Sequence, residues 1–369
     1  MRNSDNSNAF FALTRAGLWE VNVQLLQFRD ISFDSIFKLA DEQSIVGLIA
    51  AGLEHVEDRK VTKPEAVPFL KKVFFLENRN AEMNHFIVEV VKKMQDKGIY
   101  TLLVKGQGVA QCYARPQWRS SGDIDFLFDE VNYEKAKSFL TPLAISVEPE
   151  DKKKKHLAIT IDSWVVELHG LMPTDFSNRI NAGIEEVQKS IFVSGNVRVW
   201  SHEGVDVFLP SPDNDVIIIF THFLQHFFVG GIGLRQISDW CRLIWTYHEV
   251  VDRELLALRL RKMGIMSEWK AFAHFAVSYM GMPADAMPFY EFSKTLERKS
   301  RRICQRILKT GNMGHNKDQS YRGHYPLLIE KCITFWLRLG EFCGLSLIFP
   351  WDGPRFFLTY VLKRSIAIL

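Results

Sequence analysis

The spacing of apolar residues divides the chain into two helical parts with a strand-rich part between them. Apolar residues recur every three or four positions over residues 33–51, and again over residues 83–94 before Gly98, which suits a helix end. The helical period returns at Pro210 and holds to the end of the chain. Short apolar runs lie between these parts. The pattern predicts an α+β fold, in which a small mixed sheet lies between N-terminal helices and a C-terminal helical domain.

The strand-rich part supplies the segments of the expected sheet. Two runs, residues 156–161 and 164–169, flank Asp162 and Ser163 in a pattern typical of a hairpin. Asn132 stands where it could cap a helix over residues 132–140. The other expected strands cover residues 99–104, 123–128, 143–147, 197–200 and 205–209. We expect three regions, which are an N-terminal helical region (1–80), an α/β core (81–209) and a C-terminal helical domain (210–369).

Composition indicates an ordinary globular chain. Of the 369 residues, 47% are hydrophobic and 24% are charged, which excludes a disordered chain and a coiled-coil rod. The net charge of +3 does not indicate a protein that coats nucleic acid. The five cysteines form no C-x-x-C pair, so they predict reduced thiols in the cytoplasm rather than a zinc site or disulfides. The polar N-terminus has no signal-peptide pattern, and the most apolar stretch, residues 216–229, is too short to span a bilayer.

Three acidic residues indicate a divalent-cation site. Asp123 and Asp125 fall on one face of a predicted strand, because side chains in a strand alternate with a period of two. Two adjacent carboxylates repel each other unless a cation or a proton lies between them, and Mg²⁺ prefers such hard oxygen ligands. Glu167 lies in the middle of an apolar strand, where a carboxylate is costly unless it is paired or metal-bound. We therefore expect Asp123, Asp125 and Glu167 to hold one or two Mg²⁺ ions.

The segment before these acids suits a polyphosphate. Lys105 and Gly106 end a predicted strand, and a glycine at such a turn lets phosphates approach the backbone N–H groups. Lys105 and Arg119 would supply positive charge to the phosphates. Ser121, in the same loop as Arg119, is a further candidate for nucleotide binding.

This order of strand, glycine, helix, loop and Asp-x-Asp resembles the polymerase-β-like nucleotidyltransferase superfamily. Within it, "LLVKGQGVAQCYARPQWRSSGDIDFLF" and "WVVELHG" are similar to the family of uncharacterised nucleotidyltransferases. The matching residues are Lys105, Gly106, Tyr113, Arg119, Asp123, Asp125, Glu167 and His169, with Arg235 and Asp239 in a later helical region. The resemblance implies an NTP as substrate and also places His169 and Arg235 near the nucleotide. One departure is Gln107, which stands where the superfamily usually has a second small residue.

The resemblance implies a Mg²⁺-dependent enzyme that transfers a nucleoside monophosphate from an NTP to an acceptor hydroxyl and releases pyrophosphate. The acceptor is open, as a small molecule, a protein or RNA. One alternative is an RNA-modifying nucleotidyltransferase of the toxin type, and another is a non-catalytic nucleotide-binding module. The sequence carries no signal for an oligomeric state.

Structural interpretations compete with the functional ones at several positions. Glu167 could instead be a buried partner of a lysine, and His169 a hydrogen-bonded histidine at a strand end. His222 and His226, four residues apart on a predicted helix, are expected to be packed or hydrogen-bonded, because the stretch lacks the glutamate of a zinc-protease motif. The same helical spacing predicts an ion pair between Arg235 and Asp239. Finally, the run of lysines at residues 152–155 is expected to be a solvated turn rather than an RNA-binding face.

Overall fold

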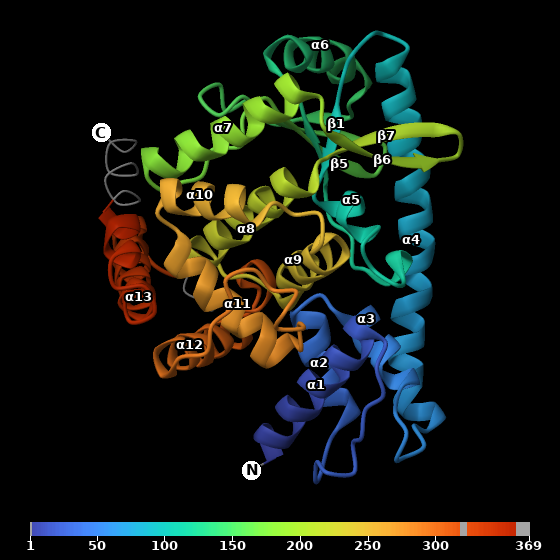
Figure 1. Cartoon of the computed structure of the whole chain (residues 1–369), viewed down its shortest axis with the longest axis vertical. Helices are drawn as coiled ribbons and strands as arrows, with labels where there is room; N and C mark the ends of the chain where they lie inside the picture. The colour runs from blue at the N-terminus through green and yellow to red at the C-terminus, as the bar shows by residue number, and fades with distance from the viewer. Residues whose placement is uncertain (1, 318–322, 359–369) are drawn as a thin grey trace.

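The structure is a computed structural model that describes residues 2–317 and 323–358. Four helices form the N-terminal part, and Figure 1 shows the last of them, α4, running along one side of the molecule from these helices to the sheet. They are α1 (Arg2–Trp19), α2 (Phe33–Glu42), α3 (Val46–Glu54) and α4 (Lys63–Gln95). Helices α1 and α3 cross closely at Gly17, where an added Cβ would lie 1.8 Å from the Leu48 carbonyl oxygen. Glycine is therefore required at that crossing.

Helix α4 begins earlier than the apolar pattern suggested. Thr62 and Glu65 form a capping box, and Pro64 stands in the first turn, where no backbone N–H is needed. The helix then continues through Pro68 for 33 residues. Position 80, at the end of the expected N-terminal region, lies inside α4, so one continuous helix joins that region to the sheet.

The central sheet is mixed and has the strand order β1-β2-β5-β4-β3. Strands β2 and β5 are parallel, and the other neighbouring pairs are antiparallel. The strands are β1 (Leu102–Val104), β2 (Ile124–Leu127), β3 (Ser146–Val147), β4 (His156–Ile161) and β5 (Trp164–His169). The hairpin expected around Asp162 and Ser163 is present as β4 and β5. A second hairpin, β6 (Val197–His202) with β7 (Val205–Pro210), forms a separate two-stranded sheet, and β7 lies beside β1.

The two faces of the sheet have different neighbours. Ile124, Phe126 and Val166 point to one face, where they pack in a buried apolar cluster with α4, the β6–β7 hairpin and α6 (Glu130–Leu140). Asp125 and Glu167 alternate with these residues and therefore face the other side. The sequence thus places an apolar core on one face and a polar site on the other.

The cap of α6 differs from the prediction. Asp129 caps the helix by accepting a hydrogen bond from the Asn132 backbone N–H, so the expectation that Asn132 is the cap was wrong by three residues. The Asn132 side chain instead accepts a hydrogen bond from the Tyr100 backbone N–H at 2.9 Å. Asn132 therefore connects α6 to the segment that leads into β1.

The remaining helices are α5 (Gly106–Ala110), α7 (Asn178–Ser194), α8 (Pro212–Val229), α9 (Leu234–Tyr247), α10 (Arg253–Met263), α11 (Met266–Met280), α12 (Lys294–Thr310) and α13 (Leu327–Ser346), with short 3-10 turns at Pro116–Trp118, Thr141–Leu143 and Asn312–Gly314. Of these, α8 and α9 lie over the polar face of the sheet, and α11 packs against α1. Phe220, Phe223, Trp240, Trp269 and Phe272 form the aromatic centre of this part. Among the described residues, none of the helices has the length and apolar character needed to cross a bilayer.

Candidate active site

The parallel pairing of β2 with β5 brings two of the acids together. Asp125 lies directly opposite Glu167, and two residues further on Leu127 lies opposite His169. Asp123 comes immediately before β2. One carboxylate oxygen from each of Asp123, Asp125 and Glu167 lies within 4.8 Å of the others. Glu167, which follows Asp125 by 42 positions in the chain, thus converges with the two aspartates, as the sequence predicts.

Asp125 is the most deeply buried of these acids, with an exposed fraction of 4%. Its Oδ1 accepts hydrogen bonds from Lys105 Nζ at 2.7 Å and from His169 Nε2 at 2.8 Å. Burial alone would raise the pKa of Asp125, but the charges of Lys105 and His169 outweigh it and lower that pKa. The carboxylate is therefore ionised at neutral pH. Its second oxygen, Oδ2, takes no hydrogen bond from any described residue.

Glu167 is held by two histidines and not by a lysine. The Nε2 atoms of His156 and His169 each lie 3.3 Å from Glu167 Oε2. Burial would raise the pKa of Glu167, but these two hydrogen bonds together lower it. The alternative of a glutamate paired with a lysine is not what the structure shows. His169 bridges Asp125 and Glu167, so it belongs to the acidic cluster.

His156 is a site residue that the prediction from the sequence lacked, although the hairpin pattern carried a signal for it. Once the hairpin is folded about Asp162 and Ser163, His156 falls opposite His169, and their ring centroids lie 4.9 Å apart. Counting the pairs outward from the turn would have found it.

The turn before α5 has a strained backbone. Lys105 has φ 58° and ψ −145°, a combination that residues other than glycine rarely adopt, and Gly106 has φ 39°. This conformation directs the Lys105 side chain to Asp125. Burial lowers the pKa of Lys105 and the Asp125 carboxylate raises it, and the net result is a raised pKa. Lys105 is therefore positively charged. Strain at such a residue is typical of a functional site.

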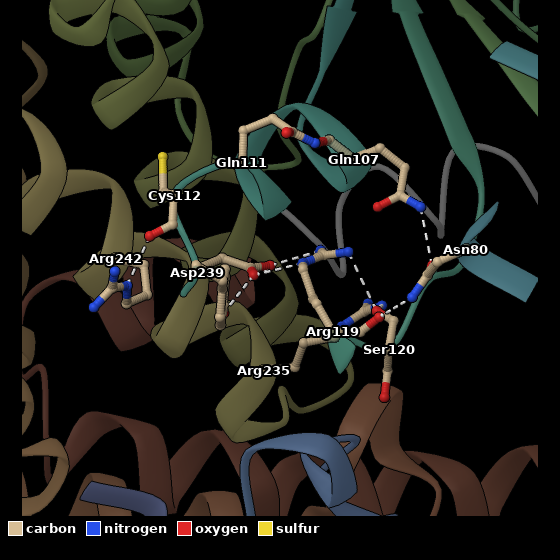
Figure 2. A network of polar contacts seen from close by, with 10 residues as sticks. Asn80, Gln107, Gln111, Cys112, Arg119, Ser120, Arg235, Asp239 and Arg242 are labelled. Atoms are coloured by element: carbon tan, nitrogen blue, oxygen red, sulfur yellow. Dashed lines mark hydrogen bonds and ion pairs between the residues drawn. The ribbon is translucent and has the colours of Figure 1, made fainter. Parts of the chain in front are cut away.

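The departure at Gln107 has a structural explanation. The buried Gln107 side chain donates a hydrogen bond to Asn80 Oδ1 at 2.9 Å, and it does not line the cleft described below. Asn80 in turn donates to the backbone carbonyls of Gln117 at 2.6 Å and Arg119 at 2.8 Å. Gln107 thus supports the loop that leads to Asp123, and Figure 2 shows the contacts from Gln107 through Asn80 to Arg119.

Arg119 is buried in a bidentate ion pair. Its Nε and Nη2 donate to the two carboxylate oxygens of Asp239 at 2.7 and 2.8 Å (Figure 2). Tyr113 donates its hydroxyl to the same carboxylate at 2.8 Å. The exposed fractions of Arg119 and Asp239 are 6% and 7%. The expected ion pair between Arg235 and Asp239 was therefore wrong, because Arg119 takes the carboxylate. Arg119 lines the cleft, but its guanidinium is directed to Asp239.

Arg235 lies at the edge of the same network. Its Nη1 donates to the Ser120 carbonyl at 3.0 Å, while its Nε has no hydrogen-bond partner among the described residues. Burial lowers the pKa of Arg235, yet a guanidinium keeps its charge at neutral pH. The Ser121 hydroxyl is also buried without a partner in the described part of the chain. Both side chains therefore have unused hydrogen-bonding groups beside the cleft.

The cleft brings the predicted residues together, except for His169. It has a volume of about 580 Å³ and lies between the polar face of the sheet, the loop before β2, and helices α8 and α9. The predicted residues that line it are Lys105, Gly106, Arg119, Ser121, Asp123, Asp125, Glu167 and Arg235. His169 lines a second cavity of about 250 Å³, which shares Lys105 and Glu167 with the cleft. Arg79, from α4, adds a further positive charge to the cleft.

His222 and His226 lie at the junction of the two cavities and line both. The two rings contact each other with centroids 4.5 Å apart. Burial, aided by the charge of Lys105, lowers the pKa of His226 to about 4 and that of His222 well below its usual value. Both imidazoles are therefore neutral at physiological pH. The sequence predicted packed histidines here and did not anticipate that they reach the site.

The acidic cluster fits a hard divalent cation. Its donors are carboxylate oxygens from Asp123, Asp125 and Glu167, the ligand type that Mg²⁺ prefers, and Asp125 Oδ2 is unengaged by described residues. The neighbouring charge of Asp125, together with burial, raises the pKa of Asp123, and a cation would offset this repulsion. The residues present therefore suit such an ion.

A mixed sheet with acids on adjacent parallel strands, beside a Lys-Gly turn, has the features of a nucleotidyltransferase. The model of the family described as uncharacterised nucleotidyltransferase matches residues 29–281, and the chain belongs to this family. The resemblance and the α+β fold class predicted from the sequence are thereby confirmed.

Two further comparisons add little. The crystal structure of an antigenic nucleotidyltransferase-like protein from Paracoccidioides brasiliensis is similar to this chain at 16% identity and a TM-score of 0.30. That similarity covers 50% of this chain and 89% of the other, and it is too weak to support an argument. No curated protein matches the chain significantly.

Proposed function

We propose that this protein is a Mg²⁺-dependent enzyme that transfers a nucleoside monophosphate from an NTP to an acceptor hydroxyl and releases pyrophosphate. The convergence of Asp123, Asp125 and Glu167 within 4.8 Å is the observation that supports this most directly. Residues 81–209 form the catalytic core in this proposal, and the helical regions 1–80 and 210–369 close the cleft. The enzyme would act in the cytoplasm.

The residues of the cleft divide the work of the transfer. Asp123, Asp125 and Glu167 would hold one or two Mg²⁺ ions, which supply charge stabilisation to the reacting phosphate. Lys105 and Arg235 face the cleft with positive charge and would bind phosphate oxygens. The attacking hydroxyl oxygen forms a bond to the α-phosphorus, while the bond from that phosphorus to the β-bridging oxygen breaks, and the hydroxyl proton passes to Glu167.

Arg119 has a different role in this proposal. Because its guanidinium is fixed on Asp239, Arg119 positions the loop that carries Ser121 and Asp123. Arg119 also lines the cleft, but its Nε and Nη2 atoms are taken up by Asp239. Phosphate binding then depends more on Lys105 and Arg235. His169 orients Asp125 through the hydrogen bond of its Nε2 atom, and the same atom lies 3.3 Å from Glu167 Oε2.

The test compares the wild-type chain with Asp125→Asn and with Glu148→Gln, which removes an exposed carboxylate away from the cleft. Purified protein is incubated with each α-labelled NTP, Mg²⁺ and cell extract, and NTP binding is measured by calorimetry with and without Mg²⁺. We expect Asp125→Asn to lose at least 100-fold in transfer, since the carboxylate lies among the reacting groups, and Glu148→Gln to retain it. Full transfer by Asp125→Asn would refute the assignment. Tight NTP binding that needs no Mg²⁺ and gives no turnover would instead support a non-catalytic module.

A further inference from the structure

We propose that the second cavity binds the acceptor, and that the acceptor is a small neutral molecule with several hydroxyl groups, of the size of a monosaccharide or a cyclic polyol. This inference rests on the proposed function, because it assigns the other substrate of the same site. We call this cavity the acceptor chamber, and its walls are formed by Lys105, Lys154, His156, Glu167, His169, Leu171, Met172, Pro173, Thr174, Ile184, Ile218, Thr221, His222, Gln225 and His226.

The position of the chamber suits a second substrate. It lies next to the nucleotide cleft, and the two share Lys105, Glu167, His222 and His226. Glu167 therefore stands between them, with Asp125 on the cleft side and His156 on the chamber side. A hydroxyl in the chamber would reach the α-phosphate across Glu167. Its oxygen would bond to the α-phosphorus as pyrophosphate leaves, and its proton would pass to the Glu167 carboxylate.

The size of the chamber favours a small acceptor. Its volume of about 250 Å³ is just below the range of roughly 300–1,000 Å³ typical of pockets for drug-sized ligands. A monosaccharide fits such a space, whereas a protein segment or a folded RNA does not. Two lysines of the run beside the chamber are paired with acids, Lys154 with Asp175 at 3.2 Å and Lys155 with Glu130 at 2.6 Å, which reduces the basic surface available to RNA. The structure therefore disfavours the RNA-modifying alternative.

Helix α8 offers neutral hydrogen-bonding groups to the chamber. His222, Gln225 and His226 line it, and none of their side chains makes a hydrogen bond with a described protein group. The lowered pKa values of both histidines leave these side chains uncharged at neutral pH. Half-buried polar groups of this kind need partners, and hydroxyls satisfy both donors and acceptors.

The opposite wall and the charges narrow the class of acceptor further. Leu171, Met172, Pro173 and Ile184 form an apolar wall, which suits the carbon face of a ring. The two lysines at the chamber are already assigned, since Lys105 would bind the nucleotide phosphates on the cleft side and Lys154 pairs with Asp175. Neither lysine is left for a phosphate or carboxylate of the acceptor. A neutral polyhydroxylated molecule matches all these features.

The experiment narrows the chamber without touching the acids. Ile184→Phe on α7 enlarges a buried wall residue, while Val193→Phe on the same helix adds the same ring at a site that is 87% exposed and serves as the matched control. Met172→Phe repeats the narrowing from a half-buried loop position, in case Ile184→Phe fails to fold. Gln225→Leu removes one hydrogen-bonding group at nearly constant volume.

Two readouts are used. In the first, α-labelled NTP and Mg²⁺ are supplied with either the small-molecule or the macromolecular fraction of a cell extract. In the second, saturation-transfer NMR measures the binding of glucose, myo-inositol and other neutral sugars and polyols to the nucleotide-free protein. We expect label in the small-molecule fraction, binding of at least one polyol, and a tenfold or greater loss of acceptor affinity in Ile184→Phe, Met172→Phe and Gln225→Leu. The affinity for Mg²⁺-NTP should stay within twofold in all variants.

Label confined to RNA or protein would overturn the inference while leaving the proposed function intact. The inference would also be overturned if all three chamber variants labelled small molecules as well as the wild type does. A failure of every neutral polyol to bind would overturn it too. A protein that binds no Mg²⁺-NTP and labels neither fraction would refute the proposed function itself. The binding of Mg²⁺-NTP therefore separates the two failures.

Discussion

The buried ion pair between Arg119 and Asp239 allows a quantitative prediction for the variant Asp239→Asn. In the wild-type chain the Asp239 carboxylate accepts three hydrogen bonds of 2.7–2.8 Å, two from Arg119 and one from Tyr113. Asparagine keeps the volume but removes the negative charge, so the guanidinium stays buried without a counter-ion. Breaking such a pair by removing one partner costs about 3–5 kcal/mol. We expect a fall of this size in the free energy of unfolding, measured by urea denaturation with tryptophan fluorescence.

Two controls separate loss of the pair from a general loss of packing. The double variant Arg119→Met with Asp239→Leu removes both charges and should recover most of the stability, because apolar replacements of a buried pair are often neutral or better. Glu249→Gln, an exposed acid just after α9, should change the free energy of unfolding by less than about 0.5 kcal/mol. If Asp239→Asn cost less than about 1 kcal/mol, or if the double variant were no more stable than the single one, the reasoning would be refuted.

Two further predictions concern single residues of the site. Lys105→Gly should be more stable than Lys105→Ala in thermal unfolding. Both variants lose the ion pair with Asp125, but only glycine relieves the backbone strain of about 1–3 kcal/mol at φ 58°. Equal stability of the two variants would show that the turn is unstrained. Burial lowers the pKa of His226 to about 4, so the folded chain binds fewer protons than the unfolded chain between about pH 6.5 and pH 4. The contribution of this residue to the free energy of unfolding is therefore present above about pH 6.5. It is lost on acidification by up to about 1.4 kcal/mol per pH unit. Urea denaturation at pH 7 and pH 5 should therefore show that the wild type loses more stability on acidification than His226→Gln, and equal losses would contradict the neutral buried imidazole.

The sequence predicted the fold class and marked the three acids as candidates because both depend on short-range patterns, whereas their convergence rests on the long-range pairing of β2 with β5. The strand period places Asp125 on the face opposite Ile124 and Phe126, and the apolar run around Glu167 marks it as an unusual buried acid. The hairpin follows from its two-residue turn. These features are local, so the printed sequence contains them.

The partners of the site residues could not be predicted in the same way. Arg119 and Asp239 are 120 positions apart, and the helical spacing pointed to Arg235 as the partner of Asp239 instead. Only the packing of α9 against the loop before β2 decides between the two arginines. The same holds for His222 and His226, since the period of α8 cannot show that this face of the helix closes a polar cavity. Long-range choices of this kind depend on how elements dock.

The parallel register of β2 and β5 also has a consequence for how the chain tolerates change. The segment that leads from one of these strands to the other contains α6, β3, β4 and the lysine-bearing turn, and its length does not enter the alignment of Asp125 with Glu167. A tag or a short insertion at the exposed Lys152 or Lys153 should therefore be accommodated. A slip of β5 by a single position, in contrast, would put Val166 or Leu168 in place of the third acid and abolish the cation cage at once.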